Sequence, residues 1–332
     1  MKSYKTINSV ILITLLCGLV SSCSKSGGYV KSEGMIWNTV YHITYKGDTD
    51  LQDSIFYIFD KVGKSLSVFD KNSLVTQLNT SDKIIADEFL IAVYDRSKEI
   101  NEKSGGYFDP TVSPLIDAWG FGKGHTVTKD TLAIDSILNF IGIQKTHRTG
   151  EWIVKEDVRT KFNFSAIAKG YGCDAVGAMF KRNGVENFMV EIGGELSLSG
   201  KSPKGKKWNI AIDAPVEGKN PGEETSMVLS LTDVGVATSG NYRNFREEGG
   251  VKTAHTISPL TGRPVIGEIL SATVVAPDCM EADGIATACM AGSVKDAKAL
   301  LENAGVEALL IMPDTLWATK GFSKFISTAS EP

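Results

Sequence analysis

The stretch VEIGGELSLSG, residues 190–200, opens the part of the sequence that decides the fold class. Its apolar residues predict a strand, but the adjacent glycines Gly193 and Gly194 interrupt it, and glycines inside a strand cost sheet stability. A ligand that approaches the backbone closely would explain the pair, and so would a simple β-bulge. Glu191 and Glu195 flank the two glycines on either side.

The segments around this stretch predict an α+β fold. Strands are expected at 35–45, 152–155, 161–164, 187–192, 208–213, 227–231, 269–276 and 306–312. Helices are expected at 51–69, 88–103, from about Ser165 to Gly184, 281–290 and 294–303. Strands mostly follow strands and helices form separate groups, so the pattern favours mixed or antiparallel sheets over a doubly wound parallel sheet.

The composition is that of a folded, water-soluble domain. The chain has 332 residues, of which 42% are hydrophobic and 22% are charged, so disorder, collagen and coiled coil are excluded. The formal net charge is −4, and no block of Lys or Arg could neutralise a phosphate backbone. Nucleic acid is therefore not expected as a partner.

The N-terminus has the features of an export signal. Lys2 and Lys5 precede an apolar run over 7–20, which is too short to span a bilayer. The run ends in small residues before Cys23, as in a bacterial lipoprotein signal, although a plain secretory signal that contains a cysteine is the alternative. We expect a signal peptide at 1–22, lipidated Cys23 and a tether at 23–32, and the folded domain at 33–328. This organisation predicts a lipid-anchored protein on the periplasmic side of the inner or outer membrane.

The cysteines and histidines do not predict a zinc site. Three cysteines remain in the expected mature domain, Cys173, Cys279 and Cys289, and they allow at most one internal disulfide. No CxxC motif is present, and the four histidines have no zinc-ligand spacing.

The segment YFDPTVSPLIDAWGFGKG, residues 107–124, combines glycine and proline with aromatic residues. Phe108, Trp119 and Phe121 could sandwich a planar ligand. The same pattern also fits a surface loop that its aromatic residues anchor over the core.

The segment KFNFSAIAKGYGCDAV, residues 161–176, predicts a strand that runs directly into a helix. Ser165 and Ala166 stand at the helix start, where free N–H groups and the helix dipole favour an anion, and Lys169 adds a positive charge. A capped helix with an exposed lysine is the alternative.

Two further segments carry polar side chains that could do chemistry. Asp283 and Thr287 lie four residues apart, so one helix face would present a carboxylate and a hydroxyl to a magnesium-like ion. The alternative is that Asp283 is an N-cap and that Thr287 bonds back to a carbonyl. His255 begins a turn rich in Pro and Gly, where a base could reach a ligand, but a single histidine can equally be structural.

Taken together and in this order, these segments resemble the ApbE flavin transferases, a family of exported FAD:protein FMN transferases. The resemblance covers nearly all of the expected mature chain. It rests on the Met35 strand and on SVFDKNSLVTQLN (67–79), FDPTVSPLIDAWGFG (108–122), SAIAKGY (165–171), VEIGGEL (190–196), ATSGNYR (237–243), HTISPLTGRPV (255–265) and EADGIAT (281–287).

The resemblance implies two closely packed subdomains with FAD in the cleft between them. It implies a magnesium ion held by the carbonyl of Ala166 and by Asp283 and Thr287, with His255 activating the acceptor hydroxyl. The flavin contacts that it implies, together with the glycine pair, are Met35, Phe69, Phe108, Asp109, Lys169, Gly193, Gly194, Glu195, Ile257 and Ala286.

The implied reaction moves FMN from FAD to a Ser or Thr hydroxyl of an exported flavoprotein, such as a subunit of a membrane redox pump, and releases AMP. The chain departs from the family pattern at Asn163 and Ser258, where the family often has Asp, and in the 35–39 segment. A magnesium-dependent FAD pyrophosphatase and a non-enzymatic FAD-binding lipoprotein are the alternative functions.

Overall fold

The computed structural model describes residues 28–122, 131–215, 224–240, 245–248, 251–254, 256–265 and 267–327. Two residues of interest from the sequence, Cys23 and His255, lie outside these ranges. Within them, no helix is both long enough and apolar enough to cross a membrane.

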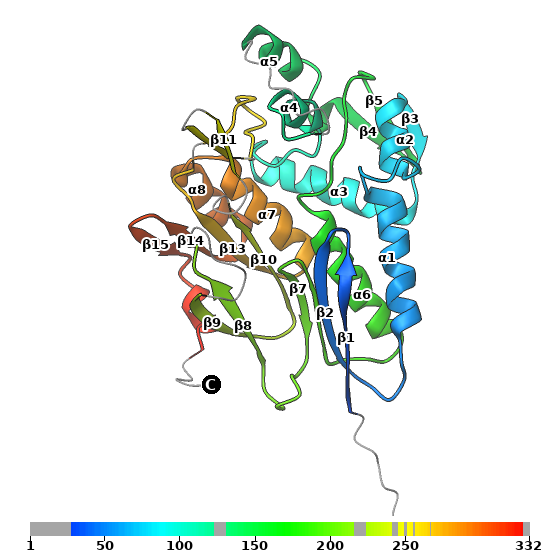
Figure 1. Cartoon of the computed structure of the whole chain (residues 1–332), viewed down its shortest axis with the longest axis vertical. Coiled ribbons are helices and arrows are strands. Elements are labelled where there is room, and N and C mark those ends of the chain that lie inside the picture. The colour runs from blue at the N-terminus through cyan, green and yellow to red at the C-terminus, as the bar shows by residue number, and fades with distance from the viewer. Residues whose placement is uncertain are drawn as a thin grey trace, which may run out of the picture.

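An eight-stranded antiparallel sheet forms the centre of the molecule (Figure 1). Its strand order is β1-β2-β6-β7-β10-β13-β14-β15. The strands are β1 (Tyr29–Ile36), β2 (Thr39–Lys46), β6 (Phe188–Ile192), β7 (Glu195–Ser199), β10 (Val234–Gly240), β13 (Ser271–Ala276), β14 (Glu307–Met312) and β15 (Thr315–Ala318).

Each face of this sheet buries a different set of side chains. Phe188, Val190 and Ile192 of β6 join the main core with helices α6 (Ala168–Arg182) and α7 (Cys279–Ala291). Leu196 and Leu198 of β7 face the other side. There they pack with the hairpin of β8 (Trp208–Asp213) and β9 (Thr225–Leu231) and with Phe322 of η2 (Phe322–Phe325). The alternation follows from the two-residue period of a strand.

The remaining elements lie around this sheet. Helix α3 contacts α1 and α7, and η1 adjoins α3. These elements are α1 (Gln52–Leu66), α2 (Leu74–Thr80), α3 (Glu88–Lys103), α4 (Ser113–Ala118), α5 (Thr131–Leu138), η1 (Ile143–Lys145), α8 (Val294–Ala304), the sheet β3-β5-β4 (Lys83–Ile85, Trp152–Lys155, Thr146–Thr149), and the hairpin β11-β12 (Phe245–Glu248, Val251–Ala254). The large sheet is antiparallel throughout, so no helix in it joins parallel strands. The predicted α+β class is therefore confirmed.

The predicted single strand at 35–45 is wrong, because these residues hold the end of β1, a two-residue turn and most of β2. The chain turns at Trp37 and Asn38, which have φ angles of 47° and 63°. Positive φ at both central residues is what a two-residue hairpin turn requires, but glycine usually fills such positions and no glycine marks this turn. The predicted strand at 161–164 is also wrong: Lys161 makes only an isolated parallel bridge with Val112.

Trp37 fixes this hairpin against two helices. A methyl group on Gly63 of α1 would lie 3.2 Å from the indole nitrogen of Trp37, and one on Gly172 of α6 would lie 2.6 Å from its ring. The indole also packs edge-on against Phe59. The tip of the hairpin is therefore held firmly beside the start of α6.

Candidate active site

The start of helix α6 is the centre of the candidate site. Residues 161–167 approach it alongside the 108–112 loop, where the Asn163 N–H donates to the Pro110 carbonyl at 2.7 Å. The side chain of Asn163 then accepts from the Ser165 N–H at 2.9 Å. The residue at the N-cap position, Ile167, offers no side-chain cap. The predicted strand-to-helix junction is thus a loop-to-helix junction.

Lys169 lies in the first turn of α6 and forms an ion pair with a buried carboxylate. Its Nζ is 2.5 Å from Oε2 of Glu195, which is only 4% exposed and begins strand β7. Burial alone would lower the pKa of Lys169, but the charges of Glu195 and Asp283 outweigh it and raise this pKa. Lys169 therefore keeps its positive charge across the physiological pH range.

Asp283 of α7 contacts the first turn of α6, and Thr287 contacts the segment just before it. The Asp283 carboxylate, which is 3% exposed, accepts the Gly170 N–H at 3.0 Å. The Thr287 hydroxyl lies 3.3 Å from the Ala166 carbonyl oxygen. Asp283 is not an N-cap, because α7 is capped by Asp278. The Thr287 hydroxyl donates to the carbonyl of Ala166, in a distant segment, and not to a carbonyl of its own helix.

These oxygen atoms suit a hard divalent cation. The Thr287 hydroxyl meets the Ala166 carbonyl and lies 3.4 Å from the Ser239 hydroxyl, and the Asp283 carboxylate lies against the first turn of α6 just beyond Ala166. Burial raises the pKa of the Asp283 carboxyl, and one lysine faces two buried carboxyl groups, so a further positive charge would be stabilised. Among the described residues no three His, Cys, Asp or Glu side chains form a metal cluster, so carbonyl and hydroxyl oxygens would have to complete the coordination.

Gly170 permits the close approach of α6 and α7 that brings these groups together. A methyl group on Gly170 would lie 2.5 Å from the Cys279 carbonyl oxygen and 2.8 Å from Cβ of Asp283. Both atoms belong to the same packed helix, so neither can move aside alone.

We expect the substitution Gly170→Ala to destabilise the protein by about 2 kcal/mol and to reduce its activity, because it forces α7 away from α6. Chemical denaturation measures the first effect. Gly177→Ala, in the same helix, is the control, since its methyl would meet only side-chain atoms at 3.0 Å or more. Equal stability of the two variants would contradict the close packing at Gly170.

The glycine pair forms a tight turn between β6 and β7 and is not a bulge. Gly193 and Gly194 have φ angles of 64° and 102°. Glu191 holds the turn: its Oε1 accepts the Gly194 N–H at 2.6 Å, and its Oε2 lies 2.5 Å from Nδ1 of His42. A methyl on Gly193 would lie 3.4 Å from Cδ of Lys169, whereas the space beside Gly194 is open.

A second group of predicted residues lies in the 108–112 loop and the 257–264 turn. Phe108 is in the main core, and Asp109 ties the loop together by accepting from the N–H groups of Thr111 and Ile143. Burial raises the pKa of Asp109. The Trp119 indole donates to the Gly262 carbonyl at 2.7 Å, and Ile257 is buried in the adjoining small cluster. A hollow of about 440 Å³ lies between these segments.

The other predicted residues are more scattered. Ala286 is buried in α7, whereas Met35 is 66% exposed and Phe69 is 79% exposed. Among the described residues, no hydrogen bond, ion pair or ring contact joins either side chain to Lys169, Glu195 or Asp283. Trp37, which sequence reasoning did not single out, packs on α6 instead.

Sequence reasoning also missed Asp174, which joins the two helices. Its carboxylate accepts the N–H groups of Cys279 and Met280 in the first turn of α7, and burial raises its pKa to about 7. An Asp five residues after Lys169 was visible in the sequence, but its partners are more than one hundred residues away. The three cysteines, Cys173, Cys279 and Cys289, are buried and free.

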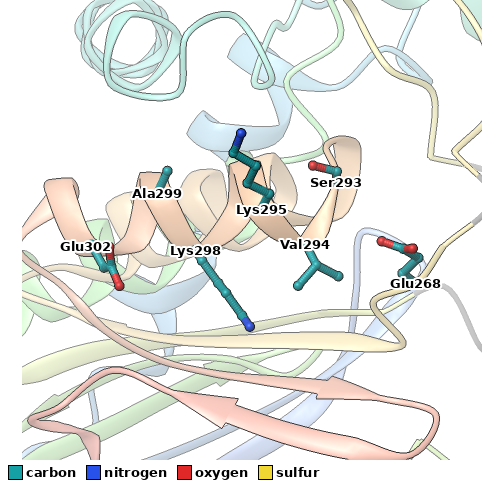
Figure 2. Close-up of a pocket in the computed structure, with 7 residues that line it drawn as sticks. All are labelled: Glu268, Ser293, Val294, Lys295, Lys298, Ala299 and Glu302. Atoms are coloured by element: carbon teal, nitrogen blue, oxygen red, sulfur yellow. The ribbon is translucent and has the colours of Figure 1, made fainter.

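A larger hollow, of about 620 Å³, lies beside α8 and shares no residue with this site. Figure 2 shows Lys298 pointing toward the strands and Lys295 pointing away from them. The amino group of Lys298 stacks over the Trp317 ring at 5.5 Å, so packing accounts for its position.

The chain is similar to known proteins over nearly its whole length. The sequence pattern of the ApbE family matches residues 37–310. The FAD:protein FMN transferase of Vibrio cholerae is 32% identical, with 97% of both chains covered. The protein of the same description from Haemophilus influenzae is 31% identical, again with 97% of both chains covered.

Solved structures agree with this result. The flavin transferase ApbE from Vibrio cholerae superimposes with a TM-score of 0.81 at 30% identity, covering 90% of this chain and 99% of that one. The apo flavinyl transferase ApbE of Pseudomonas stutzeri gives 0.82 at 28% identity, with 92% and 98% covered. The fold and the site therefore define an enzyme of the flavin transferase class. The chain belongs to the ApbE family.

Proposed function

We propose that this enzyme transfers FMN from FAD to a Ser or Thr hydroxyl of an acceptor flavoprotein and releases AMP. The hydroxyl oxygen attacks the phosphorus on the FMN side of the pyrophosphate, and the bond to the AMP phosphate breaks. The observation that supports this proposal best is the half-buried Lys169–Glu195 ion pair beside Asp283, at a helix start whose N-cap residue offers no side-chain hydrogen bond.

Different residues would bind the pyrophosphate, admit the substrate and hold the metal ion. Lys169 and the positive end of the α6 helix dipole would hold the pyrophosphate, since a fixed cation and a helix N-terminus both stabilise negative charge. The open space at Gly194 would let the substrate approach the backbone. Asp283, Thr287 and the Ala166 carbonyl would hold magnesium, which when bound supplies positive charge to the pyrophosphate.

We also propose that the protein is exported and anchored through lipidated Cys23. The apolar run over 7–20 and the small residues before Cys23 support this proposal. The acceptor would then be an extracytoplasmic flavoprotein, such as a subunit of a membrane redox pump. The anchor would keep the enzyme at the surface where such a substrate lies.

Incubation of the soluble domain with FAD, magnesium and a purified acceptor domain tests the reaction. We expect the acceptor to gain the mass of FMN while AMP appears in equal amount. Free FMN with an unmodified acceptor would instead indicate a pyrophosphatase, and intact bound FAD would indicate a carrier.

We expect His255→Ala to slow transfer by about 10²-fold while FAD binding is kept, because the hydroxyl would lose its general base. Mass spectrometry of the acceptor measures the rate, and flavin fluorescence measures FAD binding. Transfer at the wild-type rate would remove His255 from the mechanism.

A further inference from the structure

A lysine-rich loop joins strands β7 and β8. Its sequence over 201–207, KSPKGKK, has four lysines and no acidic residue, although the whole chain has a formal net charge of −4. The four side chains are exposed, and among the described residues none of them forms an ion pair. The loop therefore presents positive charge that no carboxylate neutralises.

The loop is ordered by its own backbone. The N–H and the hydroxyl of Ser202 both donate to the Lys206 carbonyl, at 2.8 Å and 3.0 Å. The Gly205 N–H donates back to the Ser202 carbonyl at 2.8 Å. Because these bonds already fix the turn, little further ordering is needed when the lysines meet an anionic partner.

The loop lies beside the start of β1. The Tyr29 hydroxyl donates to the Lys201 carbonyl at 2.5 Å, and the Tyr29 ring packs edge-on against Trp208, directly after the loop. Figure 1 shows the same arrangement, with the β7–β8 connection and the start of β1 both at the lower end of the sheet. The start of β1 and the lysine-rich loop thus share one end of the fold.

The acidic residues near this end leave the loop's charge free. Asp233 lies beside the start of the loop, where its carboxylate accepts the Gly200 N–H at 2.9 Å. Glu186 and, beyond the end of β2, Asp48 and Asp50 are exposed. In the described part of the chain none of these carboxylates pairs with a loop lysine. The amino groups remain available to an anionic surface.

The proposed lipid anchor lies within reach of this end. Cys23 precedes Gly28 by five residues, and five residues span at most about 18 Å. Acylation of Cys23 would therefore hold the start of β1, and the loop bonded to it, close to the lipid headgroups. Charges act on a membrane surface only over about 8 Å at physiological ionic strength, so this proximity is what makes the lysines effective.

The loop and the candidate site lie at opposite ends of β1. The strand has eight residues and so spans about 26 Å from Tyr29 to the turn at Trp37. Trp37 packs against Gly172 near the start of α6, where the site is centred. A membrane at the loop end would thus leave the site about 26 Å from the lipid, with room for a protein acceptor.

We propose that the 201–207 loop docks on the anionic headgroups of the membrane that holds the anchor. Four charges fall short of the six to ten phosphate contacts that a nucleic acid typically takes, but each lysine beside an anionic bilayer strengthens binding about fivefold. One lipid modification plus a basic patch is a combination that holds a protein stably at a membrane. This inference rests on the proposed anchor, and FMN transfer in solution would need no such loop.

Vesicle binding by the soluble domain tests the loop without the anchor. A domain that starts at Gly27 lacks Cys23 but contains every element of the described fold. The probe is vesicles of phosphatidylglycerol and phosphatidylcholine in equal parts. We expect a variant with all four loop lysines changed to glutamine to bind about 10²-fold more weakly than wild type. Equal binding by the two proteins, or no binding by wild type, would overturn the proposal.

A variant with the same loss of charge on other elements is the control. It changes four other exposed lysines to glutamine, namely Lys71, Lys83, Lys161 and Lys295. It should bind the anionic vesicles as wild type does, and vesicles of phosphatidylcholine alone should bind none of the three proteins. Equal weakening in both variants would show that only net charge matters and would remove the loop's role.

The mass of the mature N-terminus tests the anchor separately. Acyl chains on Cys23 without vesicle binding by the soluble domain would keep the anchor and reject the docking loop. Vesicle binding that depends on the loop, in a protein whose Cys23 is unmodified, would keep the loop's affinity for anionic lipid and reject the anchor.

Discussion

The variant Asp283→Asn should lose FMN transfer by about 10³-fold while remaining folded. The amide oxygen can still accept the Gly170 N–H, which Asp283 accepts at 3.0 Å, so the contact between α6 and α7 is preserved. What disappears is one negative charge among the oxygens that suit a divalent cation. Charge stabilisation worth about 4 kcal/mol in the transition state corresponds to this loss of rate.

Glu281→Gln is the matched control, since it makes the same chemical change two residues away on the same helix. Glu281 is buried on another side of α7, where it pairs with Lys103 at 2.6 Å and with Arg96 at 3.5 Å. Its substitution should lower the melting temperature and leave the rate of transfer unchanged. Acceptor mass and AMP release give the rates, and thermal unfolding shows that both variants are folded. Near-normal transfer by Asp283→Asn would exclude Asp283 as a metal ligand.

The local pattern predicted the elements whose signal is contained in their own sequence. The helix at 88–103 is confirmed to the residue, with an apolar period inside it and glycines directly after it. The split of 35–45 into two strands was not predicted, because Trp37 and Asn38 adopt positive φ only where packing against Gly63 and Gly172 stabilises the turn. That packing joins three segments distant in the chain.

In the candidate site, too, features within one element were predicted, and contacts between distant elements were not. Asp283 and Thr287 were predicted to share a helix face, and they contact the first turn of α6 and the segment just before it, respectively. The partner of Lys169 was not predictable from spacing, because Glu195 reaches it only through the turn at Gly193 and Gly194. Likewise, the two N–H groups that Asp174 accepts belong to a helix that starts more than one hundred residues later. Spacing identified the chemistry of single elements, and the topology determined which elements meet.

The variant Lys169→Met should destabilise the fold by about 3 kcal/mol and also lose transfer. Glu195 is buried, and its Oε2 has no hydrogen-bond partner in the described structure besides the ion pair with Lys169. Removing the lysine would leave this buried carboxylate without its counter-charge, and taking away the partner of a buried charge is strongly destabilising. Urea denaturation measures the loss.

The double variant Lys169→Met/Glu195→Gln separates stability from function. Because it removes both charges, it should regain most of the lost stability, since replacing a whole buried ion pair costs far less than breaking it. Transfer should not return, because the cation that holds the pyrophosphate is still absent. If the double variant were as unstable as Lys169→Met, the ion pair would not be what stabilises this part of the fold. If transfer returned with stability, Lys169 would act only through the fold, and the helix dipole of α6 would remain to stabilise the phosphate charge.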